Sequence, residues 1–344
     1  MESIKPKMQY RQLGKSGLKV SVLSYGLMGI KDQNLANQLV RKAYEGGVNY
    51  FDTAERYRDG EVEILLGNAL KELKAPREDL VISTKVYWGG KGVNRIGLSR
   101  KHVIEGTLAS LKRLQLDYVD ILFAHREDDE TPLEETCRAF DWLVKNGKTL
   151  YWGTSEWPAK KIWEAFGICE KYNLEKPIVE QCEYSMITRQ KMENDYVELF
   201  EKYGLGTTVW SPLCGGILAG RYNKDVPEDS RYAVEPAAKQ FYAKWLSPEN
   251  IGKTREKCLK IEQIAKELAG SMAQLAIAWV IKNKDTSTAL LGASKVSQVE
   301  DNFGALTLLE KISPEIEEKL EAILGTRPET GLNPKTWQPK PVRR

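Results

Sequence analysis

Cysteine is scarce in the sequence. Five cysteines are spread over 344 residues, and no two of them form a C-x-x-C pair. An odd number of widely spaced cysteines suggests neither a disulfide framework nor a zinc site. We therefore expect reduced thiols in a cytoplasmic protein, with no bound metal.

An excess of charge of one sign is also missing, as are long hydrophobic runs. The 51 lysines and arginines nearly balance the 48 aspartates and glutamates, which leaves a net charge of +3. Such a small charge gives no reason to expect nucleic acid or a membrane surface as a partner. No segment approaches the roughly 18 apolar residues of a membrane span, and the N-terminal MESIKPKMQY lacks the apolar stretch of a signal peptide. We expect a soluble protein without membrane insertion.

A glycine motif for dinucleotide binding is absent too. No G-x-G-x-x-G stands between a predicted strand and a helix, where a Rossmann domain would have it. The stretch GGKG at 89–92 lacks both the spacing and the following helix, so we interpret it as a loop.

Short runs rich in β-branched and aromatic residues alternate with helical patterns along the chain. The runs cover residues 19–26, 48–53, 80–86, 118–125, 150–155, 177–185, 206–213 and 287–294. One helical pattern, 99–116, has Ser99 at the N-cap position. Its expected apolar face consists of Val103, Ile104, Leu108, Leu111 and Leu114. Eight strands alternating with helices predict a single domain over residues 1–344, a parallel (β/α)8 or TIM barrel.

Three segments fall outside this repeat. Residues 8–20 contain a Gly-Lys-Ser-Gly turn between two short alternating runs, which predicts a β-hairpin that closes one end of the barrel. The seventh strand is followed by a long interval, 214–250, and loops of that length are usually functional. Residues 326–344 form a Pro-rich, basic tail that we expect to be flexible or docked on the surface.

Polar and aromatic residues stand at the ends of five predicted strands. In strand order they are Asp52, Lys85, His125, Ser155 and Trp210. In a barrel of this kind the carboxyl ends of the strands meet at one mouth, which carries the chemistry. We therefore expect these side chains to face one site.

Tyr57 follows Asp52 closely, in the stretch NYFDTAERY. A tyrosine is a poor proton donor at neutral pH unless a nearby cation stabilises its phenolate, and Lys85 can supply that charge. Asp52 would keep the ammonium ionised, and His125 could donate a hydrogen bond to a substrate oxygen. The group predicts a general acid for an oxygen that becomes negative as its carbon is attacked. The other histidine, His102, is expected to pack in its helix or to face solvent.

Several motifs, in order along the chain, resemble the successive signatures of the aldo-keto reductases. They are NYFDTAERY, ISTKVYWGG, YVDILFAH, YWGTSEW, VEQCEYS, VWSPLCGGILAGRY and LLGASKVSQVEDN. The segment from KVYWGGKG to FAHRED is most similar to the branch that contains the β-subunits of voltage-gated potassium channels and their plant and microbial relatives. The resemblance implies a barrel that binds NADP(H) and reduces carbonyl groups.

The resemblance also implies a role for single residues. The catalytic tetrad of the family falls on Asp52, Tyr57, Lys85 and His125. The residues implied to contact the cofactor are Gly26, Met28, Asp52, Ser155, Gln181, Trp210, Ser211, Leu213, Cys214, Gly215, Arg221, Arg231, Gly292, Ser294, Gln298, Asp301 and Asn302. Ser155 and Gln181 would bind the carboxamide, and Trp210 would stack on the nicotinamide. Trp88, with Tyr87 and Met28, is expected to wall a substrate pocket beside Tyr57 and His125.

Three positions depart from the channel-subunit pattern. Leu27 and Met28 stand where those proteins usually have Thr and Trp, in a shorter loop. His125 stands where the animal subunits typically have Asn. Both departures favour a working enzyme over a channel accessory. Glu156 replaces a usual Arg after the GTS motif, which leaves the cofactor contacts near the fifth strand open.

We therefore expect an NADPH-dependent reductase of aldehydes and some ketones, in which Tyr57 protonates the carbonyl oxygen. Ser294, Lys295 and Gln298 favour NADPH over NADH, because no acidic side chain is there to bind an unphosphorylated ribose. Two alternatives remain: a cofactor-sensing accessory of a membrane channel with little turnover, and a Schiff-base lyase that uses Lys85. The natural substrate stays open, as does the choice between a monomer and a homo-oligomer.

Overall fold

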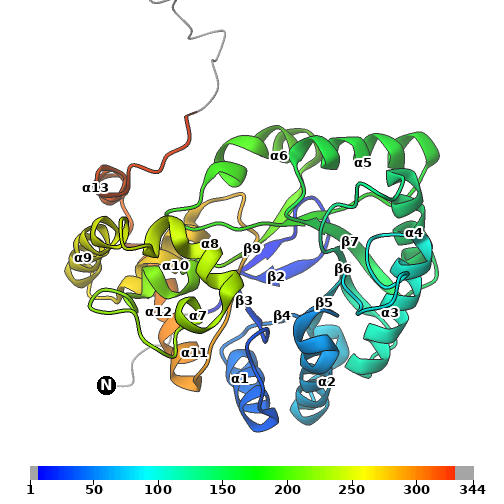
Figure 1. Cartoon of the computed structure of the whole chain (residues 1–344), viewed down its shortest axis with the longest axis horizontal. Helices are drawn as coiled ribbons and strands as arrows, with labels where there is room; N and C mark the ends of the chain where they lie inside the picture. Colours follow the sequence, from blue (N-terminus) through cyan, green and yellow to red (C-terminus); the bar gives the residue numbers. More distant parts are fainter. Residues whose placement is uncertain (1–6, 330–344) are drawn as a thin grey trace, which may run out of the picture.

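Eight parallel strands close into a barrel in the computed structural model, which describes residues 7–329 (Figure 1). Around the barrel the strands follow the order β10-β3-β4-β5-β6-β7-β8-β9, so strands that are successive in sequence are neighbours in space. Their bounds are β3 (Leu23–Gly26), β4 (Tyr50–Asp52), β5 (Val81–Val86), β6 (Val119–Ala124), β7 (Thr149–Ser155), β8 (Val179–Gln181), β9 (Gly206–Trp210) and β10 (Thr288–Leu291). This closed parallel barrel confirms the predicted (β/α)8 fold.

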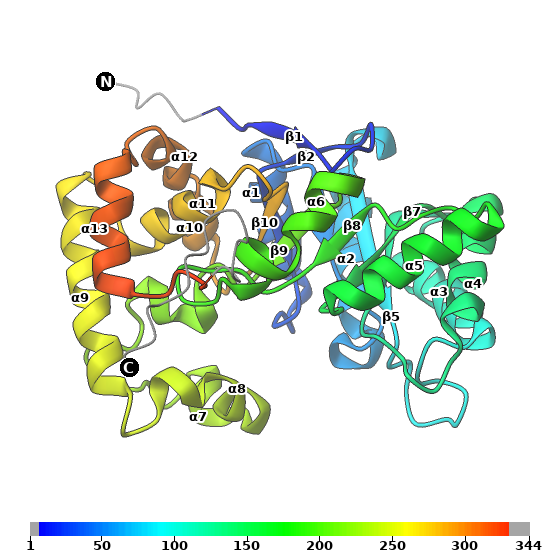
Figure 2. The ribbon, with the colours of Figure 1, turned by 90° about the horizontal axis from the view of Figure 1, so that it is seen from above.

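Helices connect the strands and surround the barrel, as Figure 2 shows from a second direction. The helices that follow β3 to β8 are α1 (Gln33–Glu45), α2 (Glu61–Leu73), α3 (Arg100–Leu114), α4 (Leu133–Lys145), α5 (Ala159–Tyr172) and α6 (Val197–Tyr203). After β10 come α11 (Val296–Asn302), α12 (Gly304–Leu309) and α13 (Pro314–Leu324).

The helix α3 begins where the sequence predicts it, since the Ser99 hydroxyl accepts a hydrogen bond from the His102 backbone N–H. Its buried face differs from the prediction at Leu108, which is 43% exposed. The small residues Gly106 and Ser110 are buried instead. The spacing of large apolar residues does not reveal such a face. Small residues such as Gly106 and Ser110 are buried because they let the helix approach its neighbours closely.

The predicted N-terminal hairpin is present as β1 (Tyr10–Gln12) and β2 (Lys19–Ser21), which pair antiparallel. Leu13 and Val20 pack against the first residues of three barrel strands, Tyr50, Val81 and Val179. The hairpin therefore closes the amino end of the barrel, as expected. The predicted strand 19–26 is in fact two strands, since β2 belongs to the hairpin and β3 to the barrel.

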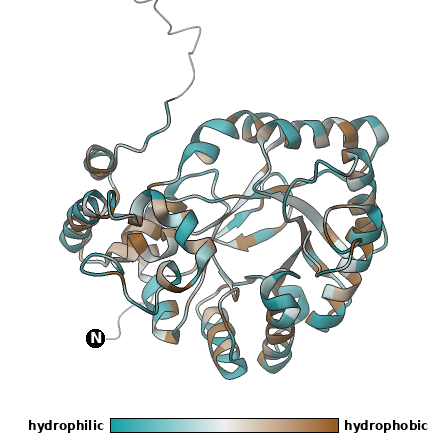
Figure 3. Cartoon of the chain, viewed as in Figure 1, coloured by the Kyte–Doolittle hydropathy of each residue, from teal (hydrophilic) through white to brown (hydrophobic). Residues whose placement is uncertain are grey.

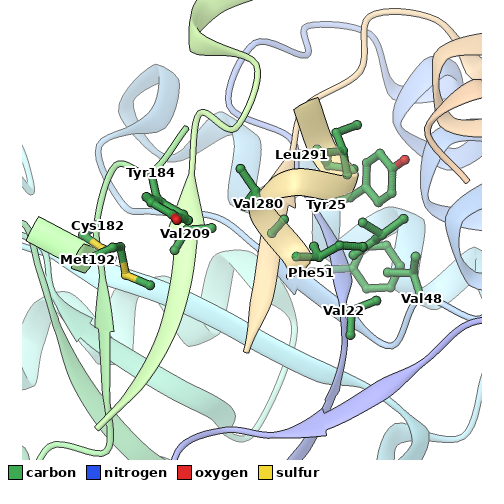
Figure 4. Close-up of a cluster of buried hydrophobic side chains, with 14 of the residues drawn as sticks. Val22, Tyr25, Val48, Phe51, Cys182, Tyr184, Met192, Val209, Val280 and Leu291 are labelled. Atoms are coloured by element: carbon green, nitrogen blue, oxygen red, sulfur yellow. The ribbon is translucent and has the colours of Figure 1, made fainter. Parts of the chain in front are cut away.

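Side chains of the barrel strands alternate between the inside of the barrel and the layer under the helices. Tyr50 lies in the inner cluster, whereas its neighbour Phe51 belongs to the outer core. Figure 4 shows Phe51 beside Tyr25 and Leu291, which are paired across β3, β4 and β10. The helices carry both hydrophobic and hydrophilic residues (Figure 3), so their apolar sides can cover this layer.

The long connection expected after β9 is present, but it is helical rather than irregular. Residues 214–250 contain the short helix η4 (Cys214–Ala219), α7 (Arg231–Val234) and α8 (Pro236–Leu246). The helices α9 (Ile251–Glu267) and α10 (Met272–Lys282) follow before β10. Local signals explain the helical segment, since Ser230 caps α7 and a proline opens α8.

The first residues of the predicted C-terminal tail lie against the barrel. Thr326 Oγ1 donates to the Met186 carbonyl at 2.6 Å, and Arg327 pairs with Glu318 at 3.3 Å. Residues 330–344, most of that tail, lie outside the described residues.

Within residues 7–329, no single helix is long and apolar enough to span a membrane. The helices α9 and α10 meet the length and composition requirements only as a pair, and that pair bends by 86°.

Candidate active site

The two-residue alternation of the strands brings three polar side chains to the carboxyl end of the barrel interior. These side chains are Asp52, Lys85 and His125. Each lies an even number of positions after a residue of the inner cluster, namely Tyr50, Val81 and Phe123 respectively. The strand-end prediction for these three residues therefore agrees with their position in the barrel.

Asp52 and Lys85 form a buried ion pair at this end of the barrel. The Lys85 ammonium also donates to the Thr53 carbonyl at 2.8 Å. The other carboxylate oxygen of Asp52 accepts from the Ser83 hydroxyl at 2.6 Å and from the Gln181 amide at 3.2 Å. With its partners fixed on β5 and β8, the carboxylate holds the ammonium in one position.

Tyr57 presents its hydroxyl to this ammonium. The distance from Lys85 Nζ to Tyr57 Oη is 3.4 Å, and Nζ lies 5.1 Å from the centre of the phenol ring. Burial acts to lower the pKa of Lys85, but the Asp52 charge and the contacts with Asp52 and Tyr57 outweigh it and raise the pKa. The ammonium is therefore charged at neutral pH, and it can stabilise a phenolate on Tyr57.

The backbone directly after Tyr57 is strained. Tyr57 opens the short helix η1 (Tyr57–Gly60), in which Arg58 and Asp59 have φ angles of 51° and 53°. Side chains other than glycine rarely adopt this left-handed region, at a cost of about 1 kcal/mol or more each. Strain of this kind clusters at functional sites.

His125 stands beside Tyr57, with the ring centroids 6.0 Å apart and the rings edge to face. Its Nδ1 atom is buried and has no hydrogen-bond partner among the described residues. Burial lowers the pKa of His125 well below its usual value, and the charges of Lys85, Arg126 and Arg56 lower it further. The imidazole is therefore neutral at neutral pH.

Trp88 lies next to His125, as expected for a wall of the substrate pocket. Its ring centroid is 4.9 Å from that of His125 and 4.6 Å from that of Tyr87. The structure thus brings Tyr57, Trp88 and His125 together. Met28, in the loop after β3, has a side chain that is 41% exposed.

The residues predicted for the nicotinamide end stand on three adjacent strands. Ser155, Gln181 and Trp210 are the last residues of β7, β8 and β9. The Gln181 amide, which contacts Asp52, also donates to Thr208 Oγ1 at 3.2 Å. The Ser155 hydroxyl accepts from Arg126 at 3.4 Å. These side chains therefore share the mouth of the barrel that holds the buried ion pair.

Glu156 holds the ring of Trp210. Its Oε1 accepts from the Trp210 indole Nε1 at 2.9 Å and from the Glu183 backbone N–H at 2.6 Å. Its Oε2 accepts from Lys191 Nζ at 2.7 Å. Glu156 itself has a φ of 62°, so this contact is made from a strained backbone position. The sequence marks Glu156 as unusual but gives no sign of its partner.

A tight turn follows Trp210. Ser211 and Cys214 have φ angles of 57° and 46°, and Gly215 has 63°. A Cβ atom on Gly215 would lie 2.5 Å from the ring of Tyr242, so only glycine fits there. The Cys214 side chain is buried, and burial raises the pKa of its thiol well above the usual value. Leu213, in the same turn, is half-buried.

The two arginines predicted near the cofactor phosphates are each paired with an acid. Arg221 lies 3.1 Å from Asp229, and Arg231 lies 2.9 Å from Glu235. Their side chains remain 39% and 48% exposed, so a phosphate could reach both.

The predicted adenosine-binding residues lie on the segment that follows β10. The Ser294 backbone N–H donates to Gln298 Oε1 at 2.7 Å, and both residues are exposed. Asn302 is buried, and its amide donates to the Tyr25 hydroxyl at 3.2 Å. The Asp301 carboxylate accepts a hydrogen bond from the Gln274 amide at 2.8 Å. Gly292 lies in open space, since a Cβ atom added there would have no atom within 4 Å. Gly26 ends β3 beside this segment, where β3 pairs with β10.

Comparison with known proteins identifies the family. Residues 22–323 match the family model described as "Aldo/keto reductase family". The chain belongs to this family. Its members are generally NAD(P)H-dependent oxidoreductases. The chain is also 44% identical over 326 residues to proteins described as "Probable voltage-gated potassium channel subunit beta" from Oryza sativa subsp. japonica and from Arabidopsis thaliana. These alignments cover 93% of this chain and 98% of each relative, and they confirm the predicted family and branch.

Some residues of this aldo/keto reductase site are visible only in the structure. Ser83 holds Asp52, and its place two residues before Lys85 on the same strand face could have signalled this. His102 is buried and contacts the Glu55 carboxylate at 3.0 Å, so the expectation that it packs is confirmed. Glu55 in turn accepts from the Tyr87 backbone N–H at 2.6 Å, which fixes the strand end that carries Trp88.

Proposed function

We propose that the protein is an NADPH-dependent reductase of aldehydes and some ketones. The observation that carries this proposal is the convergence of Tyr57, Lys85, Asp52 and His125 at one end of the barrel. Bound NADPH would supply the hydride that adds to the carbonyl carbon. The residues of the chain would orient the carbonyl and supply the proton.

Tyr57 is the proposed proton donor. Its hydroxyl points at the Lys85 ammonium, whose raised pKa keeps it charged at neutral pH. As the carbonyl oxygen gains negative charge, the proton moves from Tyr57 Oη to that oxygen, and the ammonium stabilises the phenolate left behind. His125, neutral because of its lowered pKa, would orient the same oxygen by donating a hydrogen bond from its one protonated ring nitrogen.

The proposed cofactor site extends from Trp210 to the segment after β10. The half-buried Trp210 ring fits a nicotinamide, and Ser155 and Gln181 offer polar groups to its carboxamide. The exposed residues Ser294 and Gln298 offer hydrogen bonds to the adenosine phosphate. The remaining proposed contacts are Gly26, Met28, Asp52, Ser211, Leu213, Cys214, Gly215, Arg221, Arg231, Gly292, Asp301 and Asn302.

The relatives suggest a second function, that of a channel accessory with little turnover, because both are described as channel subunits. The presence of the proposed acid Tyr57, the Lys85 ammonium and His125 supports the enzyme instead. A Schiff-base lyase is not favoured, because Lys85 is ion-paired and its raised pKa keeps the amine protonated. We also propose a cytoplasmic, single-domain protein, consistent with five free cysteines.

The test is steady-state oxidation of NADPH in the presence of a panel of aldehydes, ketones and dicarbonyls. The enzyme proposal predicts turnover that depends on the carbonyl substrate and yields the corresponding alcohol. Tight binding of NADPH without turnover of any carbonyl would favour the accessory instead.

A further inference from the structure

Trp88 contacts the proposed reaction site and also lines an open pocket of 320 Å³. Its ring lies 4.9 Å from that of His125. Trp88 also lines the pocket, together with Arg56, Arg58 and Lys91. A substrate whose carbonyl lies at His125 can therefore extend past Trp88 into a region lined by basic residues.

Two arginines lie over the ring of this tryptophan. The guanidinium carbon of Arg56 is 5.0 Å from the Trp88 ring centroid, and that of Arg126 is 5.7 Å away. Arg126 is anchored, because it donates to the His125 carbonyl at 2.5 Å and to Ser155 at 3.4 Å. Arg56 lines the pocket, whereas Arg126 is held beside His125 and Ser155.

Arg56 has no acidic partner among the described residues. Among residues 7–329, its guanidinium forms no ion pair and no side-chain hydrogen bond, and the same holds for Lys91. Arg58, by contrast, pairs with Glu61 at 2.6 Å. An unpaired arginine beside an aromatic wall is a typical anion receptor, because its planar fork matches a carboxylate or phosphate.

Carboxylates near this region do not cancel these charges. Asp59 is the one acid that lines the pocket. The acidic run 127–130 lies near the Tyr87 hydroxyl and does not line the pocket. Within that run, Asp128 is held by the Leu98 backbone N–H at 2.7 Å, and Asp129 lies 3.8 Å from Lys161. The lining of the pocket therefore keeps an excess of positive charge.

We propose that the substrate is a carbonyl compound with a second, anionic group, a carboxylate or a phosphate, which Arg56 and Arg126 bind beside Trp88. This inference rests on the proposed reductase function and names its substrate class. The reaction is unchanged: hydride adds to the carbonyl carbon, Tyr57 protonates the oxygen, and the anionic group takes no part in the chemistry.

The experiment compares para-formylbenzoate with its methyl ester, which has the same aldehyde without the charge. The value of kcat/KM is measured for both with the wild-type protein and with Arg56→Gln and Arg126→Gln. Arg41→Gln is the control, since Arg41 pairs with Glu72 between α1 and α2, away from the barrel mouth. An inorganic-phosphate titration of the wild type, read as inhibition, shows whether phosphate competes for the same site.

We expect the wild type and Arg41→Gln to prefer the carboxylate by about tenfold or more, as for one hydrogen bond to a charged group. Arg56→Gln should lower the ratio of carboxylate to ester by about 10- to 100-fold, and added salt should lower it in the wild type. Equal kcat/KM values for the two aldehydes in the wild type would overturn the proposal. So would a carboxylate preference that survives both arginine substitutions.

A binding measurement distinguishes failure of the anion site from failure of the proposed reductase function. Binding of the alcohol products, para-(hydroxymethyl)benzoate and its methyl ester, is followed by tryptophan fluorescence without any turnover. If neither aldehyde is reduced, the reductase proposal fails, but selective binding of the carboxylate that is lost in Arg56→Gln still supports an anion site. Equal binding of the acid and the ester contradicts it.

Discussion

The indole of Trp210 donates its Nε1 hydrogen to the carboxylate of Glu156 at 2.9 Å. The same carboxylate is held by Lys191 at 2.7 Å, so the ring proposed to stack on the nicotinamide is fixed through a charged residue that directly follows β7. The usual arginine at this position in channel-type relatives could not accept this hydrogen bond. Glu156 thus supports the ring of Trp210.

Glu156→Ala should weaken NADPH binding, because the Trp210 ring loses its acceptor. One hydrogen bond to a charged group contributes roughly 1.5 kcal/mol or more, so we expect an increase of about tenfold in the dissociation constant. Glu156→Gln keeps an acceptor for the indole and should change it by less than about threefold. Fluorescence titration with NADPH measures both values. Equal affinities for the wild type and Glu156→Ala would show that the contact does not support the cofactor.

A second prediction concerns pH and stability at Glu180 in β8, where burial raises the carboxyl pKa to about 8. Because the folded-state pKa is raised, the neutral acid stabilises the fold at low pH, and stability falls as the pH rises from about 4.5 to about 8. A shift of this size corresponds to a loss on the order of 5 kcal/mol. Glu180→Gln should remove this loss, because the amide stays neutral.

Thermal unfolding at pH 5 and at pH 8.5 tests this. The melting temperature of the wild type should fall more between the two values than that of Glu180→Gln. Glu310→Gln, at an exposed position, serves as the control and should follow the wild type. Parallel curves for the wild type and Glu180→Gln would mean that the buried carboxyl does not titrate in this window.

A third prediction concerns the choice of cofactor. Ser294, Lys295 and Gln298 are exposed at the start of α11, and they offer hydrogen-bond donors and one positive charge to a 2′-phosphate. NADPH should therefore bind at least about tenfold more tightly than NADH. Lys295→Met should narrow this difference by weakening NADPH alone. Tighter or equal NADH binding by fluorescence titration would refute the assignment.

The sequence predicts much of the fold because its signals are local. Eight apolar runs and the helical patterns between them give the barrel and the element order. The division of residues 19–26 into two strands was not predicted, because it depends on a distant partner. The Ser21 backbone N–H donates to Asn49 Oδ1 at 2.8 Å, and this contact forms only in the folded chain.

The same distinction holds for the candidate site. Asp52, Lys85 and His125 were predictable, since the end of a strand and the two-residue alternation decide where each side chain points. The Glu156–Trp210 contact joins residues 54 positions apart, so no local sequence pattern predicts it. Arg56 has no local signal either, because its place over the Trp88 ring is visible only in the folded chain.

Lys85→Met should damage catalysis in a specific way. Without the ammonium, the Tyr57 phenolate loses its stabilising charge, and the buried Asp52 carboxylate loses its partner. We expect kcat to fall by about 10²- to 10⁴-fold, the range typical of general acid catalysis.

Borohydride treatment of the wild type with an aldehyde should leave no substrate bound to Lys85. Trapping on Lys85, seen by peptide mass spectrometry, would support the lyase.

The most direct test of the account is Tyr57→Phe, which removes one hydroxyl and little volume. The fold and NADPH affinity should survive, because the Asp52–Lys85 ion pair and the Trp210 ring remain in place. Turnover of an aldehyde by NADPH should fall by about 10²- to 10⁴-fold, since the reaction loses its acid. The measurement is kcat for wild type and variant at saturating NADPH, with NADPH affinity determined in parallel. Near-normal turnover by Tyr57→Phe would contradict the account and leave His125 as the next candidate for the proton donor.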